Sequence, residues 1–308
     1  MQKRMIPATI PILLATCAII TWSGNAVAAL DAQVIAKAAQ TQATVFDDVV
    51  RIGWNRDDVV VKVDGMVFPP AAGLGSWAAF KPIGNGEQAI VMGDTVVFQD
   101  EVDAAMDAAF DHGLKVTALH NHFFYDEPKV CFMHISGHGP AAELATGMKT
   151  VWDAIKQVRA ANAQPATHFA GAIPDTNGKI DTRRIESITG LNAVINPGGV
   201  VKISTARTAS MHGTTIGGTM GLTSWAAFSG SDDLAVMDGD LIMVADEVQP
   251  VLKALRSSGL HIVALHNHML SEQPACYFTH FWGKGSAVEL AKGFKAVLDV
   301  QEHIHEKD

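Results

Sequence analysis

The chain is poor in the residues that mark several classes of protein. Three of its 308 residues are cysteine, so it lacks the disulfide framework of a small secreted scaffold. Lysine and arginine number 23 against 32 acidic residues, and they form no cluster that could grip a phosphate backbone. We therefore expect no nucleic-acid partner. With 48% apolar and 18% charged residues, the chain is instead typical of a globular protein.

Common catalytic signatures are also missing from the sequence. It contains no glycine-rich phosphate loop and no dinucleotide fingerprint. Ser76 and Ser224 lie in GLGSW and GLTSW, which differ from the Gly-x-Ser-x-Gly turn of serine hydrolases. These motifs therefore assign no catalytic residue.

The N-terminus has the pattern of a secretory signal. Lys3 and Arg4 precede an uncharged apolar run at Met5–Thr21, and Ala26-Val27-Ala28 supplies a small-x-small cleavage pattern. The apolar run is shorter than the roughly 20 residues that a membrane span needs. We therefore predict that residues 1–29 are removed and that the mature protein is periplasmic or secreted, with no integral membrane segment.

The cysteines leave two questions open. Cys17 follows Leu14-Ala15-Thr16, which loosely resembles a lipoprotein box, so a lipid anchor is the less favoured alternative to cleavage. Cys131 and Cys276 could form a disulfide after export. However, they occupy non-equivalent positions in the sequence repeat described next, which favours two buried free thiols.

Most of the remaining chain is a duplication. GLKVTALHNH at Gly113–His122 returns as GLHIVALHNH at Gly259–His268, with seven of ten positions identical and an offset of 146. GLGSWAAF at Gly73–Phe80 likewise matches GLTSWAAF at Gly221–Phe228. Two copies of this length indicate a duplicated domain and not a solenoid array.

The order of patterns predicts the fold class of each copy. We expect repeat domains at residues 30–160 and 181–308, joined by a linker at 161–180. Each copy combines strands with a helix that ends at glycine and a closing amphipathic helix. This order indicates an α+β fold with two tandem homologous repeats. Each repeat is expected to be a mostly antiparallel sheet packed by helices, and the two to be related by a pseudo-two-fold axis.

Several helices can be placed from local signals. Short helices capped by aspartate are expected at Asp31–Gln40 and Asp181–Gly190. The closing helices are expected at about Ala141–Arg159 and Ala287–His303. The acids Asp100-Glu101 are predicted to open another helix and to complement its dipole.

The histidines form the one repeated constellation of metal-binding side chains. In a strand, alternate side chains share a face, so His120 and His122 point the same way. A third histidine, His134, follows His120 by 14 residues. If the strand of His120 and the strand of His134 form a hairpin whose loop has an odd number of residues, His134 lies on the same face as His120. The candidate metal ligands are His120, His122, Glu127 and His134 in the first copy, and His266, His268, Glu272 and His280 in the second. In the first copy, Asp126 is the alternative to Glu127.

This constellation predicts a divalent metal site in each copy. Imidazole binds zinc, copper and iron, and three nitrogens with one oxygen make a common zinc shell. Zinc is the first choice, with copper or iron second. With a coordination position open to water, the metal could lower the pKa of that water and drive hydrolysis, and four protein ligands would instead indicate a structural or metal-carrying role. Cys276 is a less favoured additional ligand.

The alternative is a metal-free binding module of the cell envelope, which would bind a small molecule or an envelope polymer. The histidines would then be hydrogen-bonding or pH-responsive groups. A buried polar network is a further structural interpretation of the same side chains.

Longer sequence strings resemble a known family. They are GLGSWAAFKP (Gly73–Pro82), TALHNH (Thr117–His122), MHISGHG (Met133–Gly139), DEVQPVLKALR (Asp246–Arg256) and HFWGKG (His280–Gly285). Over about residues 30–300 the chain is similar to the LppY/LpqO family of bacterial exported proteins and lipoproteins. The resemblance implies export and two copies of a domain of unknown function. It implies no catalytic residue.

Overall fold

A computed structural model describes residues 29–84, 86 and 88–305 of the chain. The predicted secretory signal, except for its last residue, lies outside the described residues, as does Cys17.

The two repeats contain the same succession of main elements. The first comprises α1 (Ala32–Ala39), β1 (Ala43–Phe46), β2 (Val49–Asn55), β3 (Lys62–Val63), β4 (Met66–Val67), β5 (Gly75–Ile83), β6 (Gln88–Phe98), α2 (Val102–Asp111), β7 (Lys115–His120), β8 (Asp126–Glu127), β9 (Val130–Pro140) and α3 (Ala141–Ala161). The second comprises α4 (Thr182–Thr189), β10 (Ala193–Asn196), β11 (Val200–Ala206), β12 (Ala209–Met211), β13 (Thr214–Ile216), β14 (Thr223–Gly230), β15 (Ala235–Met243), α5 (Val248–Ser257), β16 (His261–His266), β17 (Tyr277–Gly285) and α6 (Ala287–His305).

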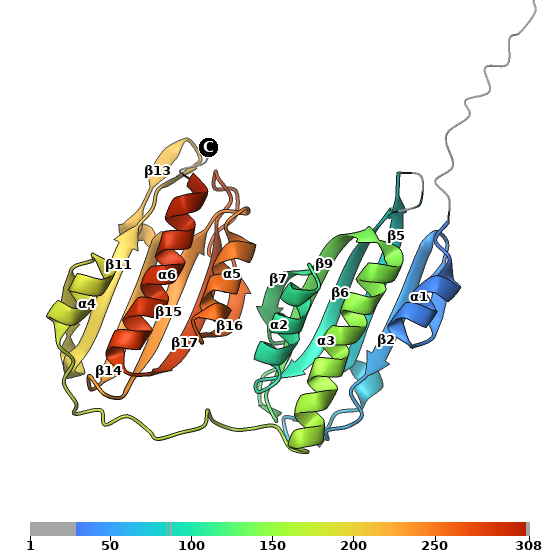
Figure 1. The fold of residues 1–308 in the computed structure, drawn as a ribbon, viewed down its shortest axis with the longest axis horizontal. Helices are drawn as coiled ribbons and strands as arrows, with labels where there is room; N and C mark the ends of the chain where they lie inside the picture. The colour runs from blue at the N-terminus through green and yellow to red at the C-terminus, as the bar shows by residue number, and fades with distance from the viewer. Residues whose placement is uncertain (1–28, 85, 87, 306–308) are drawn as a thin grey trace, which may run out of the picture.

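The main strands of both repeats form one twelve-stranded sheet. Its order is β1-β2-β5-β6-β9-β7-β16-β17-β15-β14-β11-β10, so the second half mirrors the first about the β7–β16 contact. All the strand pairs of this sheet are antiparallel. The fold is therefore α+β, with two tandem repeats related by a pseudo-two-fold axis (Figure 1).

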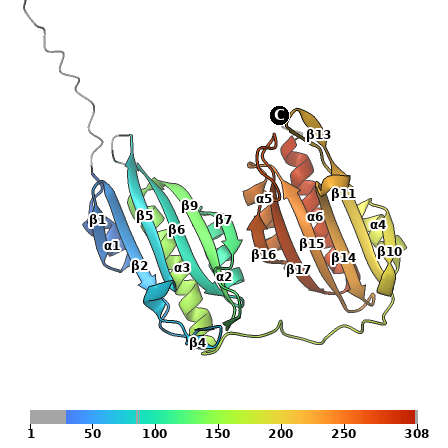
Figure 2. The ribbon, with the colours of Figure 1, turned by 180° about the vertical axis from the view of Figure 1, so that it is seen from behind.

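The helices of the described residues cover a single face of this sheet (Figures 1 and 2). They pack there on one continuous apolar core, which includes Ile35, Phe80 and Met106 in the first repeat and Phe228, Phe281 and Phe294 in the second. We call the opposite side of the sheet the open face. Because strand side chains alternate, the neighbours of these core residues along each strand point to the open face.

Local capping explains where the short helices begin. Asp31 accepts the Gln33 N–H at 2.8 Å, and Asp181 accepts the Arg183 N–H at 3.1 Å. Both side chains thereby satisfy a donor that the first helical turn leaves free. These observations confirm the two predicted aspartate-capped helices.

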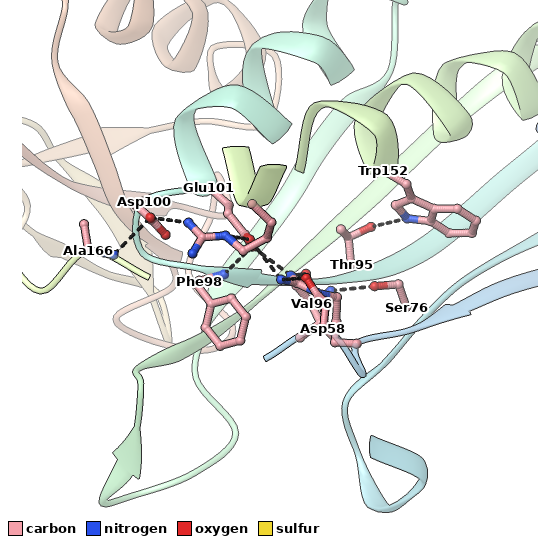
Figure 3. Close-up of polar contacts among 11 residues, drawn as sticks. Asp58, Ser76, Thr95, Val96, Phe98, Asp100, Glu101, Trp152 and Ala166 are labelled. Carbon is pink, nitrogen blue, oxygen red and sulfur yellow. Dashed lines mark hydrogen bonds and ion pairs between the residues drawn. The ribbon is translucent and has the colours of Figure 1, made fainter. Parts of the chain in front are cut away.

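Glu101 has a different role from the predicted helix-dipole acid. Its carboxylate is completely buried, accepts the Phe98 N–H at 2.8 Å and binds Arg56 at 2.7 and 2.9 Å (Figure 3). Arg159 contacts the same carboxylate at 2.7 Å. Glu101 therefore joins the loop after β2, the end of β6 and helix α3. In the second repeat, Glu247 binds Arg207 at 2.6 Å.

Two small apolar cores cover one end of the open face. In the first repeat, Val61, Leu74, Phe98 and Phe132 pack together. In the second, Ile216, Leu222, Ile242, Cys276 and Phe278 do the same. Each small core lies beside a histidine strand and gives the adjoining side chains a partly dry surrounding. Within the described residues, no helix is both long enough and apolar enough to cross a bilayer.

Candidate metal centre

The fold gathers the three repeated histidines of each copy on the open face. In the first repeat, the ring centroid of His120 lies 5.1 Å from those of both His122 and His134. In the second, the His266 centroid lies 5.1 Å from that of His268 and 5.0 Å from that of His280. The two groups have nearly the same geometry.

Strand register explains this convergence. His120 lies opposite Phe132 in the β7–β9 pair, so His134, two residues further on, shares its face. Residues 121–131 separate that opposed pair, an odd number, as the sequence argument required. In the second repeat His266 lies opposite Phe278 in the same way.

An aspartate completes each group from a neighbouring strand. Asp94 lies opposite His134 in the β6–β9 pair, and Asp240 lies opposite His280 in the β15–β17 pair. Both are buried, with 8% and 3% of their surface exposed. We call Asp94, His120, His122 and His134 the first cluster, and Asp240, His266, His268 and His280 the second cluster.

Three residues of the second cluster have donor atoms close enough for one ion, whereas His280 and the first cluster lie outside that group among the described residues. Asp240, His266 and His268 each offer a ligand atom, and these atoms lie within 4.8 Å of one another. The distance from His268 Nε2 to Asp240 Oδ2 is 3.4 Å. Asp240 Oδ1 and His266 Nε2 are buried and have no hydrogen-bond partner within the described residues. Such atoms are costly to bury alone, and a bound cation would satisfy both.

The first cluster shares part of this property. Asp94 Oδ1 is also buried without a hydrogen-bond partner in the part of the chain that the structure describes. The equivalent aspartates therefore both present an unsatisfied oxygen on the histidine-bearing face.

The structure does not bring the predicted acids Glu127 and Glu272 into the clusters. Glu127 is exposed in β8, opposite Lys62. Glu272 Oε1 accepts the Cys276 N–H at 2.7 Å, and its repeat equivalent Asp126 accepts the Val130 N–H at 2.7 Å. These hydrogen bonds hold the loops that lead into β9 and β17. Local hydrogen bonding therefore anchors one oxygen of each carboxylate to its own loop, while Glu272 Oε2 stays buried without a hydrogen-bond partner within the described residues.

The sequence argument did not include Asp94 and Asp240 among the candidate ligands, although the sequence carried a signal for them. The pair Gly93-Asp94 recurs as Gly239-Asp240 at the same 146-residue offset as the histidines. An acid repeated in step with three histidines is a better ligand candidate than an acid that is merely close in sequence.

Burial favours the neutral form of one imidazole in each cluster. Burial lowers the pKa of His122 below its usual 6.5; Asp94 opposes this shift, whereas His120 and His134 add to it. Burial lowers the pKa of His268 in the same way, with Asp240 opposing. A neutral imidazole is the form that binds metal.

Aromatic rings support the outer histidines. The His122 ring stacks on Phe132 with centroids 3.3 Å apart, and the His268 ring stacks on Phe278 at 3.4 Å. Because both phenylalanines belong to the small apolar cores, these cores orient the two imidazoles.

The two described cysteines are free thiols. Cys276 is buried in the small core of the second repeat, and its Sγ donates to the Pro274 carbonyl at 3.4 Å. Cys131 is half-buried, and burial together with Asp126 raises the pKa of its thiol to about 11. The interpretation of both as free thiols is confirmed, whereas only Cys276 is fully buried.

Comparison with solved structures gives weak similarities. The trimeric bacterial microcompartment shell protein PduB shares 10% identity, with 86% of this chain and 92% of that chain covered and a TM-score of 0.19. EtuB from Clostridium kluyveri shares 10% identity over 86% and 91% of the two chains, with a TM-score of 0.21. The double-ringed trimeric shell protein MSM0271 shares 12% identity over 71% and 85%, with a TM-score of 0.19. Scores this low carry no argument.

Comparison at the sequence level is more informative. No curated protein matches the chain. One family pattern, however, matches residues 33–154 and again residues 183–300, and so covers both repeats with all eight cluster residues. The chain therefore belongs to the family described as Domain of Unknown Function (DUF1259), of which it contains two tandem copies.

Proposed function

We propose that this protein is an exported metal-binding protein with one metal site in each repeat. The proposed ligands are the side chains of the first cluster and of the second cluster. The carrying observation is the pair of buried, partnerless atoms Asp240 Oδ1 and His266 Nε2 within a compact donor group. The same residue types recur in the first repeat, which supports a functional site over a buried polar network.

Zinc is the metal that this donor set fits first. Three imidazoles and one carboxylate match a common zinc shell, with copper or iron as the second choice. The ligands all rise from one face of the sheet, and His122 and His268 are exposed at its outer side. Zinc held there would supply Lewis acidity, which is the chemistry of a metal-dependent hydrolase.

The chain itself would position and orient such an ion. Asp94 and Asp240 are anchored in the middle of strands β6 and β15, which fixes the carboxylate. Phe132 and Phe278 hold the rings of His122 and His268 by stacking. Hydrogen bonding also orients His280, whose Nδ1 lies 3.2 Å from the Gly239 carbonyl. A hydrogen bond that fixes the ring orientation and the tautomer of a histidine raises its affinity for a metal.

Export and the narrower family assignment rest on the sequence. The basic, apolar and small-residue segments at the N-terminus support a periplasmic or secreted protein. The strings GLGSWAAFKP, TALHNH, MHISGHG, DEVQPVLKALR and HFWGKG support membership of the LppY/LpqO family within the broader family of unknown function. Lipidation at Cys17 would tether the same protein to a membrane.

The test is the metal content of the mature protein, purified from the periplasm without an affinity tag. We expect about one metal equivalent per repeat. Asp240→Asn or His266→Ala should remove half of it, and Asp94→Asn combined with Asp240→Asn should remove nearly all. His138→Ala is a matched control, because His138 is an exposed histidine of β9 outside the clusters.

The opposite result would favour the metal-free binding module. Absence of bound metal after reconstitution with zinc, copper and iron would end the metal proposal. Unchanged thermal stability with and without a chelator would agree with that outcome.

A further inference from the structure

The linker forms a cavity with the open face of the second repeat. Its volume is about 350 Å³, and its lining includes Phe169, Ile173 and Pro174 from the linker with Val236, Trp282 and Lys284 from β15 and β17. This volume is at the lower end of the range for small-molecule sites. Neither the metal clusters nor the family match assigns a role to it.

The linker is held in place at this cavity by specific contacts. The Phe169 ring stacks on His261 with centroids 4.2 Å apart. The Lys284 ammonium donates to the Phe169 carbonyl at 3.4 Å. These contacts place an apolar linker segment against strand β17 and make the cavity wall.

Two polar groups in the lining select the chemistry of a ligand. Trp282 Nε1 is buried and has no hydrogen-bond partner within the described residues. Lys284 has no carboxylate within ion-pair distance in the part of the chain that the structure describes. Asp238 lies opposite Trp282 in the β15–β17 pair but does not line the cavity. The residues that line this apolar cavity therefore carry one N–H donor without a partner and one cation.

The first repeat shows that the fold does not require these residues. At the 146-residue offset, Ser136, His138 and Ile90 replace Trp282, Lys284 and Val236. Ile90 is 42% exposed there. The tryptophan, the lysine and the covering linker are thus features of the second copy alone.

We propose that this cavity binds a small carboxylic acid with an apolar body. The body would replace water between Ile173 and Val236, and the carboxylate would accept from Trp282 Nε1–H and pair with Lys284. An anion hydrogen-bonded in this way relieves the cost of the buried, partnerless indole N–H. Trp282 lies two residues after His280 on the same strand face, a separation of roughly 7 Å. The ligand would therefore lie beside the second cluster, although its binding needs no metal.

Octanoate is a suitable probe for the mature full-length protein. We expect its addition to shift the Trp282 indole N–H signal in a ¹H–¹⁵N spectrum and to saturate, with the signal assigned from its loss in Trp282→Phe. Trp282→Phe and Lys284→Met should each weaken octanoate binding by about tenfold, since each removes one charge-assisted contact. Octanol should bind more weakly, and octylamine more weakly still.

Three results obtained without chelator would overturn the proposal. These are no shift of the Trp282 signal at millimolar octanoate, equal binding of octylamine, or wild-type affinity in both variants. Trp77→Phe is the control, because Trp77 lies in β5 of the first repeat and should leave binding unchanged. A chelator separates the two proposals. Octanoate binding that persists with chelator supports the cavity whether or not metal is found, and binding that vanishes would assign the carboxylate to the metal instead.

Discussion

Leu119 lies directly opposite Leu265 in the antiparallel contact that joins β7 to β16. The two leucines are equivalent residues of the repeat, so the pseudo-two-fold axis passes between them. Both belong to the continuous apolar core beneath the helices. The duplicated sequence thus joins at equivalent positions and makes one sheet from two.

Gln249 strengthens this contact at a position where the repeat is not symmetric. Its side chain accepts the Val116 N–H at 3.1 Å and donates to the Val116 carbonyl at 2.7 Å. We predict that Gln249→Ala lowers the free energy of unfolding by about 2 kcal/mol, because it removes both partners of a buried backbone unit. Urea unfolding measures the loss, and hydrogen exchange at the Val116 amide should accelerate.

Lys292→Gln provides the control for that measurement, since it changes an exposed pair with Glu289. Such surface pairs contribute little, so its stability should stay close to wild type. Equal stability of Gln249→Ala and wild type would show that β7 and β16 hold together without the glutamine.

Two isosteric variants distinguish which acid is the ligand of the proposed metal. We predict that Asp240→Asn loses the metal of the second repeat, whereas Glu272→Gln retains it. The reason is that Asp240 lies with the histidines, while Glu272 Oε1 accepts the Cys276 N–H. Metal analysis of both variants is the measurement. Retention in Asp240→Asn together with loss in Glu272→Gln would reverse the ligand assignment.

The buried arginine pairs should differ between the repeats. The side chains of Arg56 and Glu101 are both fully buried, whereas Arg207 keeps 28% of its side chain exposed. Arg56→Met should therefore destabilise by about 3–5 kcal/mol, the cost of breaking a buried ion pair. Arg207→Met should cost less, because water can reach the site. Calorimetric unfolding of the two variants tests the order, which a larger loss in Arg207→Met would contradict.

Cys131 should be an unreactive thiol at neutral pH. Burial raises its pKa from 9.0 to about 11, so little thiolate forms at pH 8. We predict alkylation by iodoacetamide at least about tenfold slower than in urea-unfolded protein. Between pH 9.0 and about 11 the folded state keeps a proton that the unfolded state loses, so this group lowers stability as pH rises through that window. Fast alkylation of the folded protein at pH 8 would be inconsistent with the burial.

Local signals in the sequence accounted for the helices and for the histidine geometry. Asp31 and Asp181 mark helix starts because a side chain next to the first turn does the capping. Gly113 and Gly259 mark helix ends because both adopt a left-handed backbone, with φ of 70° and 71°. His120 ends β7 and His122 lies two residues beyond the strand, where the two rings stack with centroids 5.1 Å apart.

The aspartate of each cluster could not be found in the same way, because its place depends on strand pairing. Asp94 reaches the histidines through the neighbouring strand β6, which is distant from β7 in sequence and adjoins β9. The closeness of Glu272 to His268 in sequence predicts a ligand, but one oxygen of its carboxylate accepts a hydrogen bond from the backbone of its own loop. The union of β7 with β16 was equally hidden, since a strand edge does not encode its partner in its own pattern.

Because the helices cover one face of the sheet, the opposite, open face with its two clusters is the one that another molecule can contact. A two-fold axis that runs through the sheet from face to face leaves both clusters on the same side of the sheet. A polymer or flat surface that touches one cluster therefore brings the other within reach of the same encounter. Two weak contacts, one at each cluster, would then give bivalent binding. Its avidity would depend on the distance between the two clusters along the sheet.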